Sequence, residues 1–175
     1  PAREVFWLMD APLDALARRV GEHLQARHWR LATAESCTGG LIAATLTEVA
    51  GSSDWFGWGV VSYANAAKMQ LLAVQPETLH DHGAVSEAVV RQMATGVQRL
   101  SGADWSIAVS GVAGPGGGSA AKPVGTVWFA IAGPDLRVEA FVHHFSGDRA
   151  GIRWQTVETA LSALIARVAG QTSQA

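Results

Sequence analysis

The sequence predicts an α/β fold, a three-layer α/β/α domain with a mixed β-sheet. Segments with helical periodicity alternate along the chain with short segments rich in β-branched and aromatic residues, and this alternation is typical of a sheet covered by helices. Two strand-like segments near the C-terminus are joined only by Gly133-Pro134-Asp135, a link too short for a parallel crossover. The sheet is therefore expected to contain both parallel and antiparallel strands.

The first elements are a helix, a strand and a second helix. The first helix is predicted from apolar residues at helical spacing, which are Leu13, Leu16, Ala17, Val20 and Leu24. A short strand is expected over residues 30–34. It leads through a polar turn, residues 35–40, into a helix over residues 41–46, which Gly51-Ser52-Ser53 ends.

The middle of the chain predicts one strand and two helices. Residues 57–64 are rich in β-branched and aromatic side chains and predict a strand. Asn65 is expected to be the N-cap of a helix that carries Lys68. Ser86 precedes a further helix, whose apolar face is Val89, Val90, Met93, Ala94 and Val97.

The last third predicts three strands and a long helix. A buried strand over residues 105–110 is followed by a glycine-rich loop over residues 111–125. Strands are expected over residues 126–132 and 138–145. A final helix opens at Ser146-Gly147-Asp148-Arg149 and has the clearest apolar face in the chain.

Composition indicates one soluble domain over residues 1–175, with its core at about residues 12–168. The 175 residues are 49% hydrophobic and 16% charged, which is enough apolar material for one core. No apolar run reaches the roughly 18 residues of a membrane helix, no export signal is visible, and a net charge of -2 gives no support for nucleic-acid binding. A single cysteine fits the reducing cytoplasm, and seven tryptophans fit a core and the interface of a homo-oligomer.

Ser36 lies at the predicted turn between a strand and a helix. Backbone N–H groups at a helix start lack partners within the helix and favour negative charge, which suits a serine whose attack creates an oxyanion. Gly39 and Gly40 would let the backbone approach a ligand. The alternative is that Ser36 or Thr38 simply caps the helix.

A serine nucleophile needs a base, and none of the six histidines lies in a segment that resembles a site. No histidine or cysteine spacing indicates a metal site. Lys68 is one of only two lysines, and a lysine in a water-poor pocket can accept a serine proton. A solvated helix lysine is the alternative. Tyr63, the only tyrosine, could orient protons or be an ordinary strand aromatic.

Two further segments could hold an anion. The loop from Gly111 to Gly118 follows a buried strand and could present backbone N–H groups to a phosphate, although it has neither the P-loop nor the dinucleotide pattern. The alternative is that this loop is only a long connector between two strands. Arg149 at a helix start is suited to a phosphate or carboxylate.

Seven motifs in series resemble the CinA C-terminal domain family, which includes the nicotinamide-nucleotide amidohydrolases. The resemblance extends from about Leu31 to Leu164. The motifs are Ala34-Glu35-Ser36-Cys37-Thr38-Gly39-Gly40, Ala50-Gly51-Ser52-Ser53, Tyr63-Ala64-Asn65-Ala66-Ala67-Lys68, His82-Gly83-Ala84-Val85-Ser86, Gly111-Val112-Ala113-Gly114-Pro115, Lys122-Pro123-Val124-Gly125-Thr126-Val127-Trp128 and Phe145-Ser146-Gly147-Asp148-Arg149.

The resemblance implies hydrolysis of the carboxamide of nicotinamide mononucleotide to nicotinate mononucleotide and ammonia, with no metal and no cofactor. It implies Ser36 as nucleophile, Lys68 as base and Tyr63 as a support for proton transfer. The substrate-binding residues that it implies are Thr38, Gly39, Gly40, Ser53, Gly111, Gly114 and Arg149. Ala64, where the family usually has a small hydroxyl residue, and Gly116, where many members have aspartate, depart from its pattern.

Two other functions stay open from the sequence. One is a nucleotide-binding module that has kept the pocket without turnover, which retention of Ser36, Tyr63 and Lys68 disfavours. The other is an accessory protein of DNA uptake or damage, for which the chain supplies no nucleic-acid surface.

Overall fold

A computed structural model describes residues 2–171, with side chains from residue 13 onward. The helices are α1 (Ala2–Gln25), α2 (Leu41–Thr47), α3 (Asn65–Leu72), α4 (Pro76–His82), α5 (Glu87–Ser101) and α6 (Arg149–Gly170), with a 3₁₀ turn η1 (Ser52–Asp54). The strands are β1 (Leu31–Glu35), β2 (Phe56–Val61), β3 (Trp105–Gly111), β4 (Thr126–Ala132) and β5 (Val138–His144). Among the described residues, no helix is long and apolar enough to cross a membrane.

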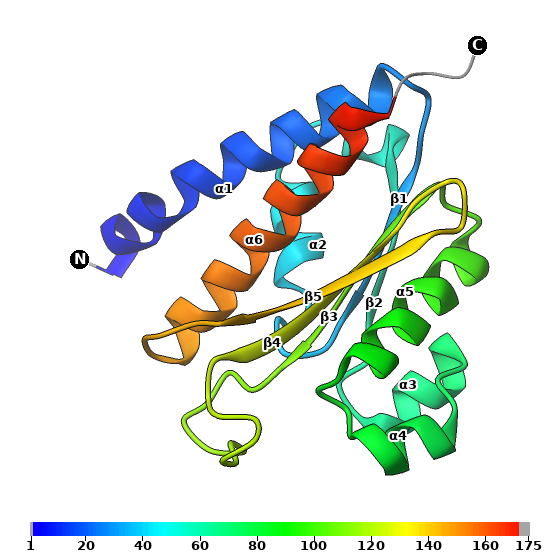
Figure 1. Ribbon diagram of the computed structural model, residues 1–175. Coiled ribbons are helices and arrows are strands. Elements are labelled where there is room, and N and C mark those ends of the chain that lie inside the picture. The colour runs from blue at the N-terminus through cyan, green and yellow to red at the C-terminus, as the bar shows by residue number, and fades with distance from the viewer. Residues whose placement is uncertain (1, 172–175) are drawn as a thin grey trace.

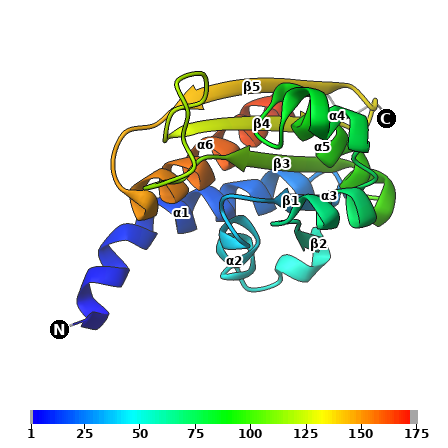
Figure 2. The ribbon, with the colours of Figure 1, turned by 90° about the horizontal axis from the view of Figure 1, so that it is seen from below.

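The five strands form one mixed sheet in the order β2-β1-β3-β4-β5, visible from below in Figure 2. Strands β2, β1 and β3 are parallel, whereas β4 is antiparallel to both β3 and β5. The expected mixed sheet is confirmed, and the turn between β4 and β5 falls at Gly133-Pro134-Asp135.

Helices cover both faces of the sheet (Figure 1). On one face, α1, α2 and α6 pack on a core that includes Leu31, Ile107 and Phe129. On the other, α3 and α5 pack on a layer of small strand residues such as Ala32 and Ala108, while α4 packs on α5. Successive strand residues face opposite sides, so β1 and β3 contribute to both cores and three layers result.

Three local predictions are corrected. The strand expected to reach residue 64 ends at Val61, because Ser62 and Tyr63 leave the sheet and turn their carbonyl groups toward Lys68. Asn65 is the first helical residue of α3, and the cap position falls on Ala64, which makes no side-chain cap bond. Residues 76–82, where the sequence predicts no helix, form α4, which has no buried residue and therefore no apolar periodicity to reveal it.

Candidate active site

Ser36 directly follows β1 at the carboxyl end of the parallel strands. Its backbone N–H donates to the Val109 carbonyl oxygen of β3 at 3.1 Å, which fixes it to the sheet, and the residue keeps 9% of its surface exposed. The chain then turns through Gly40, whose φ of 98° requires glycine, into α2. The predicted strand, turn and helix around Ser36 are confirmed.

Lys68 reaches Ser36 from α3. Its Nζ atom lies 3.1 Å from the Oγ atom of Ser36. Nζ also donates to the carbonyl oxygens of Ser62 at 2.7 Å and Tyr63 at 3.3 Å. The residue is 1% exposed, so the solvated-lysine alternative is wrong. The structure brings together a hydroxyl and an amine that are 32 positions apart in the sequence.

The surroundings of Lys68 favour its neutral form. Burial lowers the pKa of Lys68 from the ordinary lysine value, because the charged form loses its hydration. A neutral amine has two N–H donors and one lone pair. In the neutral form, the two donors would serve the Ser62 and Tyr63 carbonyl groups, and the lone pair would face the Ser36 hydroxyl.

Glu35 holds the turn after β1, a role that sequence reasoning missed. Its carboxylate is 1% exposed and accepts four hydrogen bonds at the start of α2. The donors are the Thr38 hydroxyl at 2.6 Å and the backbone N–H groups of Gly40 at 3.1 Å, Ile42 at 2.9 Å and Ala43 at 2.8 Å. An acidic residue just before a helix that lacks its own side-chain cap is the signal that could have identified it.

Tyr63 and Gly114 meet at the guanidinium of Arg149. Nη2 of Arg149 donates to the Tyr63 hydroxyl at 3.0 Å, and Nη1 donates to the Gly114 carbonyl oxygen at 2.8 Å. Arg149 thereby joins α6, the glycine-rich loop and the segment before α3. The Tyr63 side chain is exposed, and its link to Lys68 in this structure is its carbonyl group rather than its hydroxyl.

Arg153 lies beside Arg149 and was not among the predicted site residues. Its Nη2 donates to the Thr38 carbonyl oxygen at 2.7 Å. Both arginines line a cavity of about 640 Å³ with Pro115 and Val124 of the glycine-rich loop. Positions four residues apart on a helix share a face, and this spacing could have identified Arg153.

The three predicted binding residues of the turn are already engaged within the protein. Thr38 is fully buried, with its hydroxyl on Glu35 and its carbonyl on Arg153. The N–H of Gly39 donates to the Ser36 carbonyl oxygen at 3.0 Å, and that of Gly40 donates to Glu35. These groups shape the turn, and of the three only Gly39 is exposed.

Two other predicted binding residues, Gly111 and Ser53, lie outside the turn after β1. Gly111 ends β3 opposite Val127, where a Cβ atom would lie 2.6 Å from a Val127 methyl carbon, so packing requires a small residue there. Ser53 lies in η1 before β2. Since Leu31 pairs with Phe56 in parallel, Ser53 sits at the opposite end of the sheet from Ser36 and is not brought to the site.

Cys37 is buried beside Ser36. Burial raises the pKa of its thiol to about 12, so the thiol stays protonated at neutral pH. A nucleophilic cysteine needs exposure and a lowered pKa, and Cys37 has neither.

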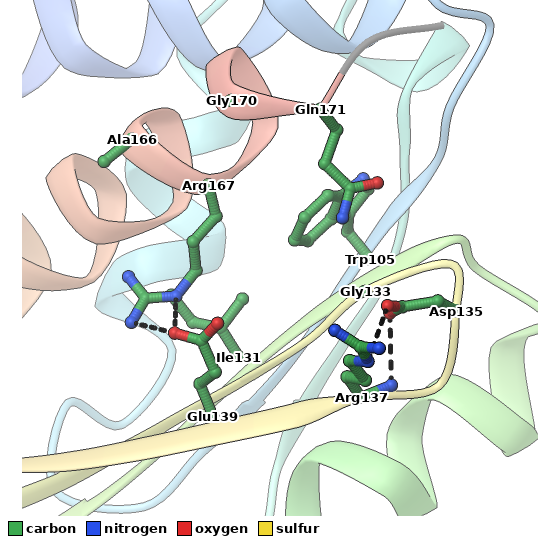
Figure 3. Close-up of a pocket in the computed structure, with 10 residues that line it drawn as sticks. All are labelled: Trp105, Ile131, Gly133, Asp135, Arg137, Glu139, Ala166, Arg167, Gly170 and Gln171. Carbon is green, nitrogen blue, oxygen red and sulfur yellow. Dashed lines mark hydrogen bonds and ion pairs between the residues drawn. The ribbon is translucent and has the colours of Figure 1, made fainter. Parts of the chain in front are cut away.

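A second cavity of about 270 Å³ lies at the far end of the sheet (Figure 3). Its charged residues are paired: Arg167 with Glu139 at 2.7 Å and Arg137 with Asp135 at 3.3 Å. It is lined by the start of β3 and the end of α6, so it is separate from the cavity at Arg149. Within residues 13–171, no cluster of three or more histidine, cysteine or acidic side chains could hold a metal ion.

Comparison with known proteins identifies the family of this chain. The family model of the CinA C-terminal domain matches residues 13–168. The nicotinamide-nucleotide amidohydrolase PncC of Enterobacter agglomerans is 53% identical over 87% of this chain and 96% of its own length, and that of Pseudomonas putida is 53% identical over 88% and 96%. A crystal structure of a CinA superfamily protein from Klebsiella pneumoniae has a TM-score of 0.87 at 45% identity and covers 91% of this chain and 99% of that one. The chain therefore belongs to the CinA C-terminal domain family.

Proposed function

We propose that this protein is a nicotinamide-nucleotide amidohydrolase that converts nicotinamide mononucleotide to nicotinate mononucleotide and ammonia through an acyl-enzyme on Ser36. The observation that carries the proposal is the buried Lys68 amine 3.1 Å from the Ser36 hydroxyl. Relatives that are about half identical and carry the amidohydrolase name supply the substrate. The candidates to hold that substrate are the glycine-rich loop and Arg149, which bonds to Gly114 of this loop and to Tyr63.

The dyad can perform both halves of an acyl transfer. The neutral Lys68 amine takes the Ser36 proton as Oγ bonds to the carboxamide carbon, giving a tetrahedral intermediate. The C–N bond then breaks, and the ammonium of Lys68 returns the proton to the departing nitrogen, which leaves as ammonia. In the second half, Lys68 takes a proton from water, the resulting hydroxide attacks the ester, and Ser36 recovers its proton as nicotinate mononucleotide is released.

The test is ammonia release from nicotinamide mononucleotide by the wild type, Ser36→Ala and Lys68→Met. Both variants should lose activity by about 10⁴-fold or more, because members of one catalytic unit fail together. If Ser36→Ala kept its activity, the proposed mechanism would be wrong. A wild type that binds the mononucleotide and releases no ammonia would instead support the binding module without turnover.

Two further properties stay predictions, a homo-oligomeric state and a cytoplasmic location. The edge strand β2 and the adjoining α3 support the first, with Trp58 47%, Val61 46% and Leu71 48% exposed. Apolar side chains on an unprotected sheet edge favour association. Light scattering on the wild type and on Trp58→Lys tests the homo-oligomeric state. The variant should form an assembly of smaller mass than the wild type.

A further inference from the structure

Two charged side chains connect the glycine-rich loop, residues 112–125, to neighbouring elements. Near the start of the loop, Arg149 of α6 donates to the Gly114 carbonyl oxygen at 2.8 Å. Near its end, the Nζ atom of Lys122 donates to the His82 carbonyl oxygen at 2.6 Å. The first contact belongs to the candidate active site, whereas the proposed function gives the second contact no role.

Lys122 binds at a place that suits a positive charge. His82 is the last residue of α4, and the final carbonyl groups of a helix lack partners within it and carry its negative dipole. Gly83 follows with a φ of 73°, and a Cβ atom there would lie 3.2 Å from the Nζ atom of Lys122. Glycine at position 83 therefore both ends the helix and leaves room for the amine.

The segment that Lys122 binds is itself fixed to the sheet and to α5. The hydroxyl of Ser110, in β3, donates to the Ala84 carbonyl oxygen at 2.8 Å. The hydroxyl of Ser86, the N-cap of α5, donates to the Gly83 carbonyl oxygen at 2.8 Å. Because the connector between α4 and α5 is tied down at both points, a bond to His82 holds the loop against the body of the protein.

The end of the loop that Lys122 holds is also a wall of the cavity at Arg149. Val124, two residues after Lys122, lines this cavity together with Pro115. A Cβ atom at Gly114 would lie 2.5 Å from a methyl carbon of Val124, so Val124 packs directly on the residue whose carbonyl group binds Arg149. Movement of Lys122 would therefore change both the cavity wall and the Arg149 contact.

We propose that Lys122 is a positioning residue that latches the glycine-rich loop onto the end of α4 and so keeps the cavity at Arg149 in its binding shape. Ser36 and Lys68 belong to other parts of the chain, so release of the latch weakens substrate binding and leaves bond cleavage nearly unchanged. The proposal rests on the proposed function for the identity of the substrate. The latch itself is a property of the free protein.

The first experiment separates KM from kcat in ammonia release from nicotinamide mononucleotide. In Lys122→Met, KM should rise about 3- to 10-fold, the factor expected for the loss of one hydrogen bond, while kcat stays within about twofold. Lys122→Arg keeps a charged donor and should restore a low KM. An unchanged KM in Lys122→Met, or a fall in kcat as large as the rise in KM, would overturn the positioning role.

The second experiment needs no turnover and measures amide hydrogen exchange in the free protein. The N–H groups of Val112 and Gly125 close the base of the loop, with bonds of 2.9 and 2.8 Å to the Thr126 and Val112 carbonyl oxygens. In Lys122→Met both should exchange about 3- to 10-fold faster, because the loop opens more often.

Arg137→Met is the matched control for the exchange experiment. It removes a charge that is exposed at the other end of the sheet, and it should leave the exchange of Val112 and Gly125 unchanged. Equal exchange in the wild type and Lys122→Met would overturn the latch. If the wild type released no ammonia and the exchange still depended on Lys122, the proposed function would fail while the latch stands.

Discussion

The Nζ atom of Lys68 lies 3.1 Å from the Oγ atom of Ser36 and is held there by the carbonyl groups of Ser62 and Tyr63. These carbonyls belong to the segment that leaves β2 just before α3. The amine is thus positioned by backbone atoms, which no side-chain substitution removes. In the proposed mechanism, the protonation state of this amine decides whether Ser36 can attack.

Activity should increase with pH as Lys68 loses its proton. Burial lowers the pKa of Lys68, so the protonated and inactive form should give way to the neutral base below the usual lysine range. The measurement is kcat/KM against pH from neutral to alkaline conditions. In Tyr63→Phe, the rise of kcat/KM with pH should occur over the same pH range, which would assign this rise to Lys68. Loss of the rise in this variant would contradict that assignment.

Cys37 should be dispensable and unreactive. Its thiol is buried with a pKa raised to about 12, so little thiolate forms at neutral pH. Cys37→Ala should keep activity within a few-fold, and iodoacetamide should modify the thiol only after unfolding. Rapid inactivation of the native wild type by iodoacetamide, with Cys37→Ala resistant, would contradict this.

Glu35→Gln should destabilise the protein and lower its activity. The substitution keeps the shape but replaces one carboxylate oxygen with an amide that cannot accept the N–H groups of α2, for an expected loss of about 1–3 kcal/mol in the free energy of unfolding. Urea denaturation measures it. Glu48→Gln, at the exposed other end of α2, makes the same charge change and should be neutral; equal effects would show that charge alone matters.

Gly96→Ala should separate α5 from α3. A Cβ atom at Gly96 would lie 2.0 Å from the Leu72 carbonyl oxygen, so α3 must shift, and Lys68 with it. The expected loss is about 1–3 kcal/mol of unfolding free energy, together with a lower kcat. Gly170→Ala is the matched control, because position 170 is helical and has nothing within 4 Å. If both variants behaved alike, helix propensity rather than the α3–α5 contact would be the cause.

Much of the fold follows from local patterns. Apolar periodicity located α1, α5 and α6, and the short link at Gly133-Pro134-Asp135 identified the antiparallel pair β4 and β5. Helix α4 was missed because it buries no side chain. The early end of β2 was missed because its cause, the bonding of two carbonyl groups to Lys68, is a tertiary contact.

The site was harder to predict from local patterns than the fold. Spacing could not pair Ser36 with Lys68, since they lie on different elements that only the sheet topology brings together. The resemblance of the sequence to the CinA C-terminal domain family supplied that pair. Glu35 and Arg153 were missed because each binds backbone atoms of the turn, a role that residue type alone does not reveal. Ser53 was included from its motif and lies at the other end of the sheet.

The hairpin between β3 and β4 has a consequence for how such a protein can diversify. Its strands pair without interruption up to Gly111 and Val127, and residues 112–125 then project beyond the sheet at the end where α6 begins (Figure 1). Pro115 and Val124 of this segment line the cavity, whereas Ser36 and Lys68 belong to other elements. Doubling a loop's length costs only about 0.6 kcal/mol. Under the proposed function, insertions there would change which ligand binds, while the residues that break the amide bond stay unchanged.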